Sequence, residues 1–330
     1  MILSLVVPCY NEEAVLPVTI RRLIALLENL IKSGLLSENS HVLLVDDGSR
    51  DSTWKIIQAA SVESSLINGI KLSRNRGHQN ALLAGLLDAK GEAVISVDAD
   101  LQDDLGAIEK MILLYKKGDD IVYGVRKNRE TDTFFKRLTA EGYYKLLGRF
   151  GVEVVFNHAD YRLMSRRTIE ALRGFSEVNL FLRGILPQLG FRTSVVYYDR
   201  AERFAGESKY PLGKMMALAW QGVTSFSTFP LRVITILGLL ISLGSLGITL
   251  WAIYIRLFSE LAVPGWTSTV VPIYLLGGIQ LLCIGIIGEY LAKIYLETKR
   301  RPHFFIEERA QSSATARSIL TENSRKVGGE

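Results

Sequence analysis

Acidic and polar side chains follow three short apolar stretches in the first third of the chain. The first stretch runs through Pro8 and is followed by Tyr10 and Glu12, and the second ends at Asp46 and Asp47. An aromatic ring can stack on a nucleobase, and a carboxylate can accept hydrogen bonds from ribose hydroxyls. Tyr10 and Glu12 after the first stretch therefore offer groups that suit a nucleoside.

The third apolar stretch is followed by an Asp-x-Asp pair, Asp98 and Asp100, and then by Gln102. If the backbone stays extended, residues two apart point to the same side. Carboxylate and amide oxygens suit Mg²⁺ or Mn²⁺, and such ions usually also bind substrate phosphates. Taken singly, each acidic turn has a simpler interpretation as ordinary turn or helix-cap chemistry, and only their combination favours a site.

The elements around these residues predict an α/β fold. Short apolar runs at 2–7, 42–45, 67–72, 93–97 and 120–123 alternate with helical patterns at 13–31, 52–63, 79–89 and 105–116. This alternation is typical of βαβ units and a mostly parallel sheet, in which ligands bind beyond the carboxyl ends of the strands. The chain has no G-x-G-x-x-G after the first strand and no phosphate-binding G-x-x-x-x-G-K-[ST] motif.

Apolar residues are concentrated late in the chain. Residues 233–255 and 261–288 carry no formal charge, which predicts two membrane spans at about 232–256 and 269–292. Only Arg256 is basic between them, whereas the tail from Lys299 to Lys326 is rich in Lys and Arg. The positive-inside rule then places both termini in the cytoplasm, at the inner (plasma) membrane.

The remaining boundaries follow from composition. We expect a cytoplasmic domain at 1–207, a juxtamembrane amphipathic helix at 208–229, the two-span region at 230–296 and a largely disordered basic tail at 297–330. Residues 131–150 have the pattern of an interfacial helix, although packing on the sheet explains it equally well. Glycines in both spans would allow close helix approach, so a homo-oligomer is a further, weaker expectation.

Overall composition excludes several classes. Hydrophobic residues make up 48% and charged residues 22%, which excludes global disorder. The net charge of +5 is too small for a dedicated nucleic-acid binder. Two cysteines cannot make a disulfide framework or a cysteine zinc site.

Four motifs in this order resemble glycosyltransferase family 2: VVPCYNEE (6–13), VDDGSRDST (45–53), SRNRGHQNALLAG (73–85) and VDADLQDD (97–104). The likeness extends through GVRKNRET (124–131), ADYRLMSRR (159–167) and RFAGESKYPL (203–212). More narrowly, the chain is similar to the bacterial polyprenyl-phosphate (bactoprenol) glucosyltransferase group, which is related to dolichol-phosphate mannose synthase. The resemblance implies a GT-A (Rossmann-like) cytoplasmic domain, a divalent metal, a nucleotide-sugar donor and a polyprenyl-phosphate acceptor.

The resemblance also implies residue roles. The nucleotide sugar would be held by Pro8, Tyr10, Glu12, Asp47 and Asp98. The metal would be held by Asp98, Asp100 and Gln102. The phosphates of donor and acceptor would be bound by Arg126, Arg129, Arg162, Arg203 and Lys209. The candidate catalytic residues are Asp160 and Asp98.

The chemistry qualifies the role of Asp160. A phosphate monoester has a second pKa of about 6, so a lipid phosphate nucleophile needs little deprotonation at neutral pH. We therefore expect Asp160 mainly to orient Arg162 or the acceptor, with base catalysis secondary. Direct displacement implies inversion at the anomeric carbon.

The sequence therefore predicts a metal-dependent, inverting membrane glycosyltransferase that moves a sugar onto polyprenyl (undecaprenyl) phosphate. The resemblance favours UDP-glucose over a GDP-sugar. One alternative is a processive polysaccharide synthase, which should have more spans and a Q-x-x-R-W-like motif. The other is a non-enzymatic nucleotide-binding scaffold, which would tend to lose the metal ligands.

Overall fold

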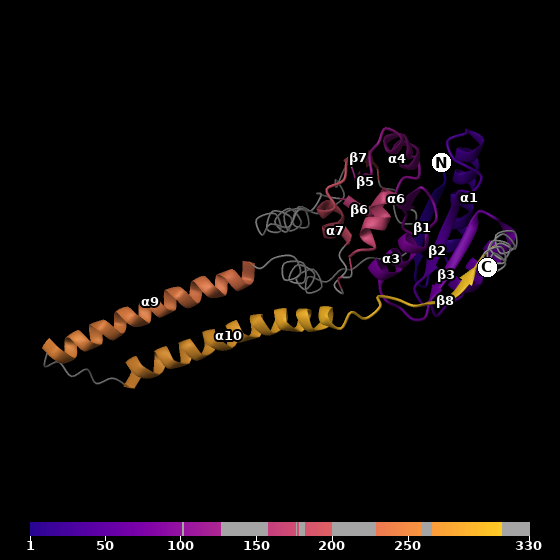
Figure 1. Ribbon diagram of the computed structural model, residues 1–330. Coiled ribbons are helices and arrows are strands. Elements are labelled where there is room, and N and C mark those ends of the chain that lie inside the picture. Colours follow the sequence, from indigo (N-terminus) through magenta and orange to yellow (C-terminus); the bar gives the residue numbers. More distant parts are fainter. Residues whose placement is uncertain are drawn as a thin grey trace, which may run out of the picture. The chain divides into compact units, whose positions relative to one another are not determined.

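The computed structural model describes residues 1–100, 102–126, 158–175, 177, 182–199, 229–258 and 266–311. Contacts between residues divide the chain into two compact units. The first comprises 1–141, 153–209 and 301–330, and the second comprises 142–152 and 210–300. Figure 1 shows the elements of both units, and each unit is described by itself.

The first unit is built on an eight-stranded sheet with the order β7-β5-β6-β4-β1-β2-β3-β8. Its strands are β1 (Leu3–Cys9), β2 (His41–Asp46), β3 (Ile67–Leu72), β4 (Ala93–Ser96), β5 (Ile121–Arg126), β6 (His158–Ser165), β7 (Thr193–Tyr198) and β8 (Ile306–Ala310). The β4-β1-β2-β3 block is parallel, as is the β5-β7 pair. Strand β6 is antiparallel to both neighbours, and β8 is antiparallel to β3.

Helices pack on both faces of this sheet. The helices are α1 (Leu16–Lys32), α2 (Thr53–Glu63), α3 (His78–Asp88), α4 (Ala107–Lys116), α6 (Arg166–Leu172) and α7 (Leu182–Gln188). One buried cluster joins Leu5 and its strand neighbours to α1, α2 and α4. A second cluster joins Val6 to α3, α6 and α7. Because successive strand residues point to opposite faces, the near-continuous apolar runs supply both layers.

The expected strands within the first 126 residues are present, and their carboxyl ends lie where the predicted sheet requires. Strands β6, β7 and β8 were not predicted from the sequence pattern. Strand β6 lies between β4 and β5 and brings Asp160 next to the end of β4, since Ser96 pairs with Arg162.

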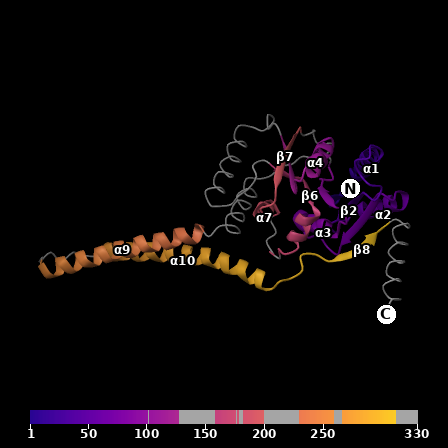
Figure 2. The same cartoon turned by 45° about the horizontal axis from the view of Figure 1, so that its top comes forward.

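Within the tail predicted to be largely disordered at 297–330, of which residues 312–330 lie outside the described residues, Ile306–Ala310 form strand β8. It pairs with β3 and covers that edge of the sheet, as both views show (Figures 1 and 2). Glu308 accepts hydrogen bonds from Trp54 Nε1 at 2.9 Å and Lys71 Nζ at 3.2 Å, and Arg309 forms a bidentate ion pair with Asp88. The segment Ile306–Ala310 is too polar to be recognised by alternation, and the exposed edge of β3 gives it a partner.

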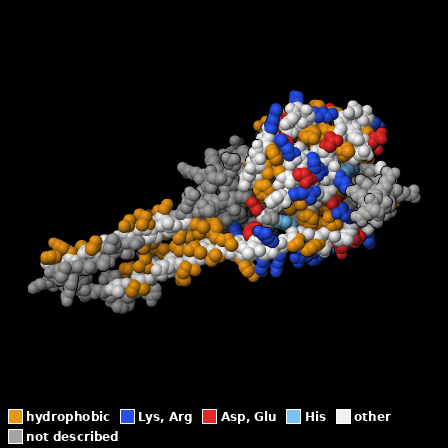
Figure 3. Space-filling model, in the orientation of Figure 1, with side chains coloured by type: hydrophobic (Ala, Val, Ile, Leu, Met, Phe, Trp, Pro, Cys, Tyr) orange, Lys and Arg blue, Asp and Glu red, His pale blue; other side chains and the backbone are white. Residues whose placement is uncertain are grey.

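The second unit contains two long helices, α9 (Phe229–Phe258) and α10 (Trp266–Thr298). Helices thus cover both expected spans, although α10 begins before Pro272 and includes it. Among the described residues, one stretch, Ile279–Thr298, is long and apolar enough to cross a membrane. Its apolar side chains are exposed, including Leu281 and Ile284, and Figure 3 shows such side chains along both helices. The helices expected at 131–150 and 208–229 lie outside the described residues.

Candidate functional site at the strand ends

The carboxyl ends of β1, β2 and β4 lie side by side in the sheet. Cys9 pairs with Asp46, and the Asp47 amide donates to the Cys9 carbonyl at 2.9 Å, which joins the first two strand ends. Tyr10 follows and is 42% exposed as a residue, so its ring is available for stacking. The Glu12 amide donates to Thr53 Oγ1 at 2.9 Å. The structure therefore brings together these sequence-predicted nucleoside residues, from Pro8 to Asp47.

Asp47 has a defined structural contact. Its two carboxylate oxygens accept hydrogen bonds from the backbone amides of Arg76 at 2.7 Å and Gly77 at 2.9 Å. Burial raises its pKa, and these two hydrogen bonds oppose the increase. Asp47 thus holds the loop that leads into α3, and its predicted contact with the nucleoside is a separate proposal.

Gly48 makes this arrangement sterically feasible. It adopts a φ of +67°, which L-residues rarely adopt, and an added Cβ would lie 2.6 Å from the backbone of Arg74 and Asn75. The loop after β3 can therefore approach the turn after β2 only if residue 48 is glycine.

Asp160 is the centre of the most highly connected group of charged side chains at this end of the sheet. Its carboxylate accepts hydrogen bonds from Arg162 Nη2 at 2.7 Å, Gln79 Nε2 at 3.2 Å and Arg183 Nη2 at 3.2 Å, and His78 Nε2 lies 3.5 Å away. We call these five residues the Asp160 cluster. They come from β6, α3 and α7, elements that are far apart in the sequence.

The electrostatics of the Asp160 cluster favour an ionised aspartate. Burial alone would raise the pKa of Asp160, but His78, Arg162 and Arg183 hold it well below its usual range. In turn, Asp160 and Asp98 raise the pKa of His78 against the effect of burial. A carboxylate held so firmly in its charged form is a weak proton acceptor, so this geometry suits positioning better than base catalysis.

Arg162 requires a correction. It was predicted to bind phosphate, but its side chain on β6 is completely buried and paired with Asp160. Burial lowers its pKa, and Asp160 opposes that change. Its guanidinium donates to Asp160 Oδ1 and is shielded from solvent.

Arg183 is the residue that sequence reasoning missed. Its side chain is 33% exposed while its guanidinium contacts Asp160 through two nitrogens, Nε at 3.3 Å and Nη2 at 3.2 Å. It is therefore the basic member of the cluster on α7 that solvent can reach. No motif marked it, since its position depends on how α7 packs on the sheet.

Asp98 lies at the end of β4, 3.9 Å from His78 Nε2, and its side chain is 38% exposed. Burial raises its pKa to about 6, and the neighbouring carboxylates Asp103, Asp160 and Asp100 raise it further while His78 opposes them. Residues 99 and 100 form a turn, so the extended geometry expected for Asp98 and Asp100 is not observed. Gln102 is buried, and its backbone N–H donates to Asp100 Oδ1 at 3.3 Å.

The predicted metal ligands are Asp98, Asp100 and Gln102, and Leu101 between them lies outside the described residues. Within the described residues, no group of three or more His, Cys, Asp or Glu side chains is arranged to hold an ion. The donor types nevertheless fit a divalent cation, because Asp98 lies among carboxylates that a cation would stabilise in the charged form.

Arg126 lies at the end of β5, beside the same acidic turn. Its Nη2 donates to Asp103 Oδ1 at 3.4 Å and its Nε donates to Tyr198 Oη at 3.3 Å. The Tyr198 hydroxyl also donates to Asp103. The structure thus brings the predicted phosphate ligand Arg126 next to the Asp98–Asp103 segment. Arg129, Arg203 and Lys209 lie outside the described residues.

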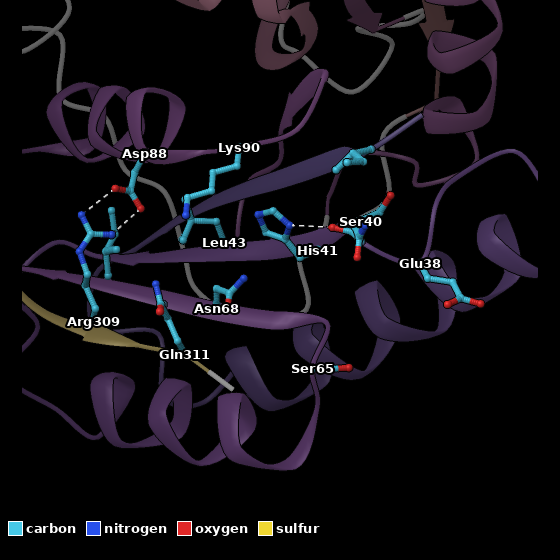
Figure 4. A pocket seen from close by; sticks show the side chains of 14 residues that line it. Glu38, Ser40, His41, Leu43, Ser65, Asn68, Asp88, Lys90, Arg309 and Gln311 are labelled. Carbon is cyan, nitrogen blue, oxygen red and sulfur yellow. Dashed lines mark hydrogen bonds and ion pairs between the residues drawn. The ribbon is translucent and has the colours of Figure 1, made fainter. Parts of the chain in front are cut away.

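A cavity of about 630 Å³ lies elsewhere, at the opposite ends of the strands. Figure 4 shows that His41, Asn68 and Lys90 line it, together with the ion pair of Asp88 and Arg309. It contains none of the residues of the strand-end site.

This fold and site define a class: a doubly wound α/β domain with an acidic site at the carboxyl ends of its parallel strands, joined in sequence to long apolar helices. The family model for glycosyl transferase family 2 matches residues 4–173. The chain belongs to glycosyltransferase family 2, which confirms the GT-A fold and glycosyltransferase activity predicted from the motifs.

Two relatives cover nearly the whole chain. The uncharacterized glycosyltransferase YkoT of Bacillus subtilis (strain 168) is 48% identical, over 93% of this chain and 91% of its own. The bactoprenol glucosyl transferase of Shigella phage SfV is 42% identical, over 94% of this chain and 100% of its own. The resemblance to the bactoprenol glucosyltransferase group is thereby confirmed.

A solved structure, glucosyl-3-phosphoglycerate synthase from Mycobacterium tuberculosis with Mn²⁺, UDP and phosphoglyceric acid, is also similar. It is 20% identical, with a TM-score of 0.43 over 68% of this chain and 76% of that chain.

Proposed function

We propose that this protein transfers glucose from UDP-glucose to polyprenyl phosphate at the cytoplasmic face of the membrane, with inversion at the anomeric carbon. The 42% identity to a bactoprenol glucosyl transferase along that protein's entire length supports this reaction. The long apolar helices, of which Ile279–Thr298 could cross a membrane, suit an acceptor whose tail stays in lipid.

The observation that carries the proposal is the pairing of opposite charges at the strand ends. Carboxylates follow β4, whereas His78, Arg183 and Arg126 lie around them. A nucleoside diphosphate bound with a divalent cation needs both kinds of group, acidic ligands for the ion and basic donors for the phosphates.

Asp98, Asp100 and Gln102 would hold Mg²⁺ or Mn²⁺. The ion would supply charge neutralisation for the diphosphate leaving group. Arg126 would bind a phosphate of the donor. Its guanidinium is partly exposed at the end of β5 and is already held by Asp103 and Tyr198.

The acceptor step requires positioning more than deprotonation. An oxygen of the lipid phosphate forms the new bond to the anomeric carbon while the bond to the diphosphate breaks, and the diphosphate leaves with the electron pair. The lipid phosphate is mostly dianionic at neutral pH. Asp160 therefore acts by holding Arg183 and His78, which present positive charge toward the acceptor.

A transfer assay tests the proposal. Purified full-length protein in detergent receives undecaprenyl phosphate, Mg²⁺ or Mn²⁺ and one of several labelled UDP- and GDP-sugars, and label is followed into the organic phase. We expect transfer from UDP-glucose that is abolished by chelator and by Asp100→Ala. Glu109→Ala, an exposed carboxylate on α4, is the matched control and should retain activity.

Two results would contradict the proposal. Transfer from a different donor alone would refute the UDP-glucose assignment and leave the acceptor assignment standing. Folded protein that neither transfers sugar nor binds nucleotide would instead favour the scaffold.

A further inference from the structure

A second cavity of about 530 Å³ lies between the loop after β3 and the segment after α10. Arg74, Arg76, Arg301 and His303 line it, and none of the described residues that line it is acidic. We call this cavity the basic pocket. Nothing in the proposed transfer reaction uses Arg74, Arg301 or His303.

The two walls of the basic pocket are held together by main-chain hydrogen bonds. Strand β3 pairs with β8, and beyond the end of that ladder the Ser73 amide donates to the Phe305 carbonyl at 3.0 Å. On the other side, Asp47 and Gly48 hold residues 74–77 in place. The basic side chains are therefore presented by a rigid frame.

The pocket has unsatisfied polar groups. Within the described part of the chain, the buried donor Arg76 Nε has no hydrogen-bond partner, which favours an acceptor such as a phosphate oxygen; Asn80 Oδ1 also has none, but it is itself an acceptor and does not favour an anion. The pocket also lies at the amino end of α3, where the helix dipole favours negative charge. The nearby carboxylate of Asp47 accepts hydrogen bonds from the backbone amides of Arg76 and Gly77 and does not line the pocket.

We propose that the basic pocket binds a phosphate group. Three guanidinium groups around a cavity of this size are the usual recognition chemistry for phosphate oxygens. The course of the chain favours a lipid headgroup as the source. Arg301 follows the end of α10 at Thr298 by three residues, which span at most ~11 Å. If Ile279–Thr298 crosses the membrane, Arg301 therefore lies at headgroup level.

Binding can be measured apart from transfer. Full-length protein in neutral detergent is titrated with inorganic phosphate and, separately, with dioctanoyl phosphatidylglycerol, and binding is followed by phosphorus NMR. We expect Arg301→Gln and Arg74→Gln each to weaken binding about tenfold, the effect of one charge-assisted hydrogen bond. Arg300→Gln is the matched control, because Arg300 is adjacent and exposed but does not line the pocket.

The two probes distinguish the sources. Binding of the lipid about tenfold tighter than inorganic phosphate supports a headgroup, and equal affinities support a free phosphate; both support the pocket. Equal binding by wild type and both pocket variants would overturn the proposal. Displacement of both probes by UDP would overturn it as well, by assigning the pocket to the donor. None of these outcomes depends on whether the protein transfers glucose.

Discussion

The Asp160 cluster and the β8 edge are both built from carboxylates paired with basic side chains, but they differ in burial. Asp160 is 8% exposed and lies above the completely buried Arg162, whereas Arg309 is 46% exposed in its pair with Asp88. A buried charge that loses its partner is costly, whereas an exposed pair is screened by water and salt. Loss of one partner should therefore destabilise the Asp160 cluster strongly and the β8 edge only weakly.

Removing Asp160 should have the largest effect. Asp160→Ala leaves the Arg162 guanidinium buried without its carboxylate, which should lower the free energy of unfolding by about 3 kcal/mol. The double variant with Arg162→Met should recover part of this loss, since no buried charge then remains. Thermal unfolding in detergent measures both. A double variant less stable than Asp160→Ala would contradict the view that loss of Asp160 leaves an unpaired buried charge on Arg162.

Substitution of Gly48 should cause the second largest loss of stability. Gly48→Ala combines a left-handed backbone with a 2.6 Å contact to the Arg74 main chain, so it should cost more than about 2 kcal/mol. Gly34→Ala is the matched control, because Gly34 has a φ of +75° but no atom within 4 Å of an added Cβ, and it should cost about 1 kcal/mol. Equal losses of stability in Gly48→Ala and Gly34→Ala would mean that the turn after β2 and the loop after β3 do not approach closely.

A pH experiment tests the part of the first unit next to the β8 edge, through His41 on β2, which lines the same cavity as Arg309. Burial lowers the pKa of His41, which lines the cavity beside β8 and contacts Ser4 Oγ through Nε2 at 3.2 Å. The folded protein therefore favours the neutral ring, so the stabilisation is complete above the unfolded pKa of about 6.5 and is lost as the pH falls through the folded value. We expect the difference in Tm between wild type and His41→Gln to shrink between pH 7.5 and 5.5. A difference that does not change with pH would contradict this.

The ion pair on β8 should give the smallest effect. Arg309→Gln removes the bidentate contact with Asp88 and should cost less than about 1 kcal/mol, with a further decrease at high salt. Thermal unfolding at low and high ionic strength measures this. A loss as large as that of Asp160→Ala, unaffected by salt, would remove the distinction between the two regions.

The sequence by itself determined the parallel core and the identity of the family. Apolar runs such as 2–7 and 42–45 have few ways to be buried other than as neighbouring strands between helices, and the acidic turns must then meet at their carboxyl ends. Pro8, Tyr10, Glu12, Asp47 and Asp98 were accordingly found at those ends.

The strand at Ile306–Ala310 and the positions of Arg183 and Arg162 depend on tertiary structure and could not be predicted from local pattern. The polar segment Ile306–Ala310 is a strand because β3 offers it an edge, and Arg183 belongs to the site because α7 packs beside β6. Arg162 shares a motif with Asp160, yet its place in the central strand β6 turns it inward and buries it. Spacing along the chain predicts which residues share a face, whereas burial and ion pairing depend on elements that meet only when the whole sheet is assembled.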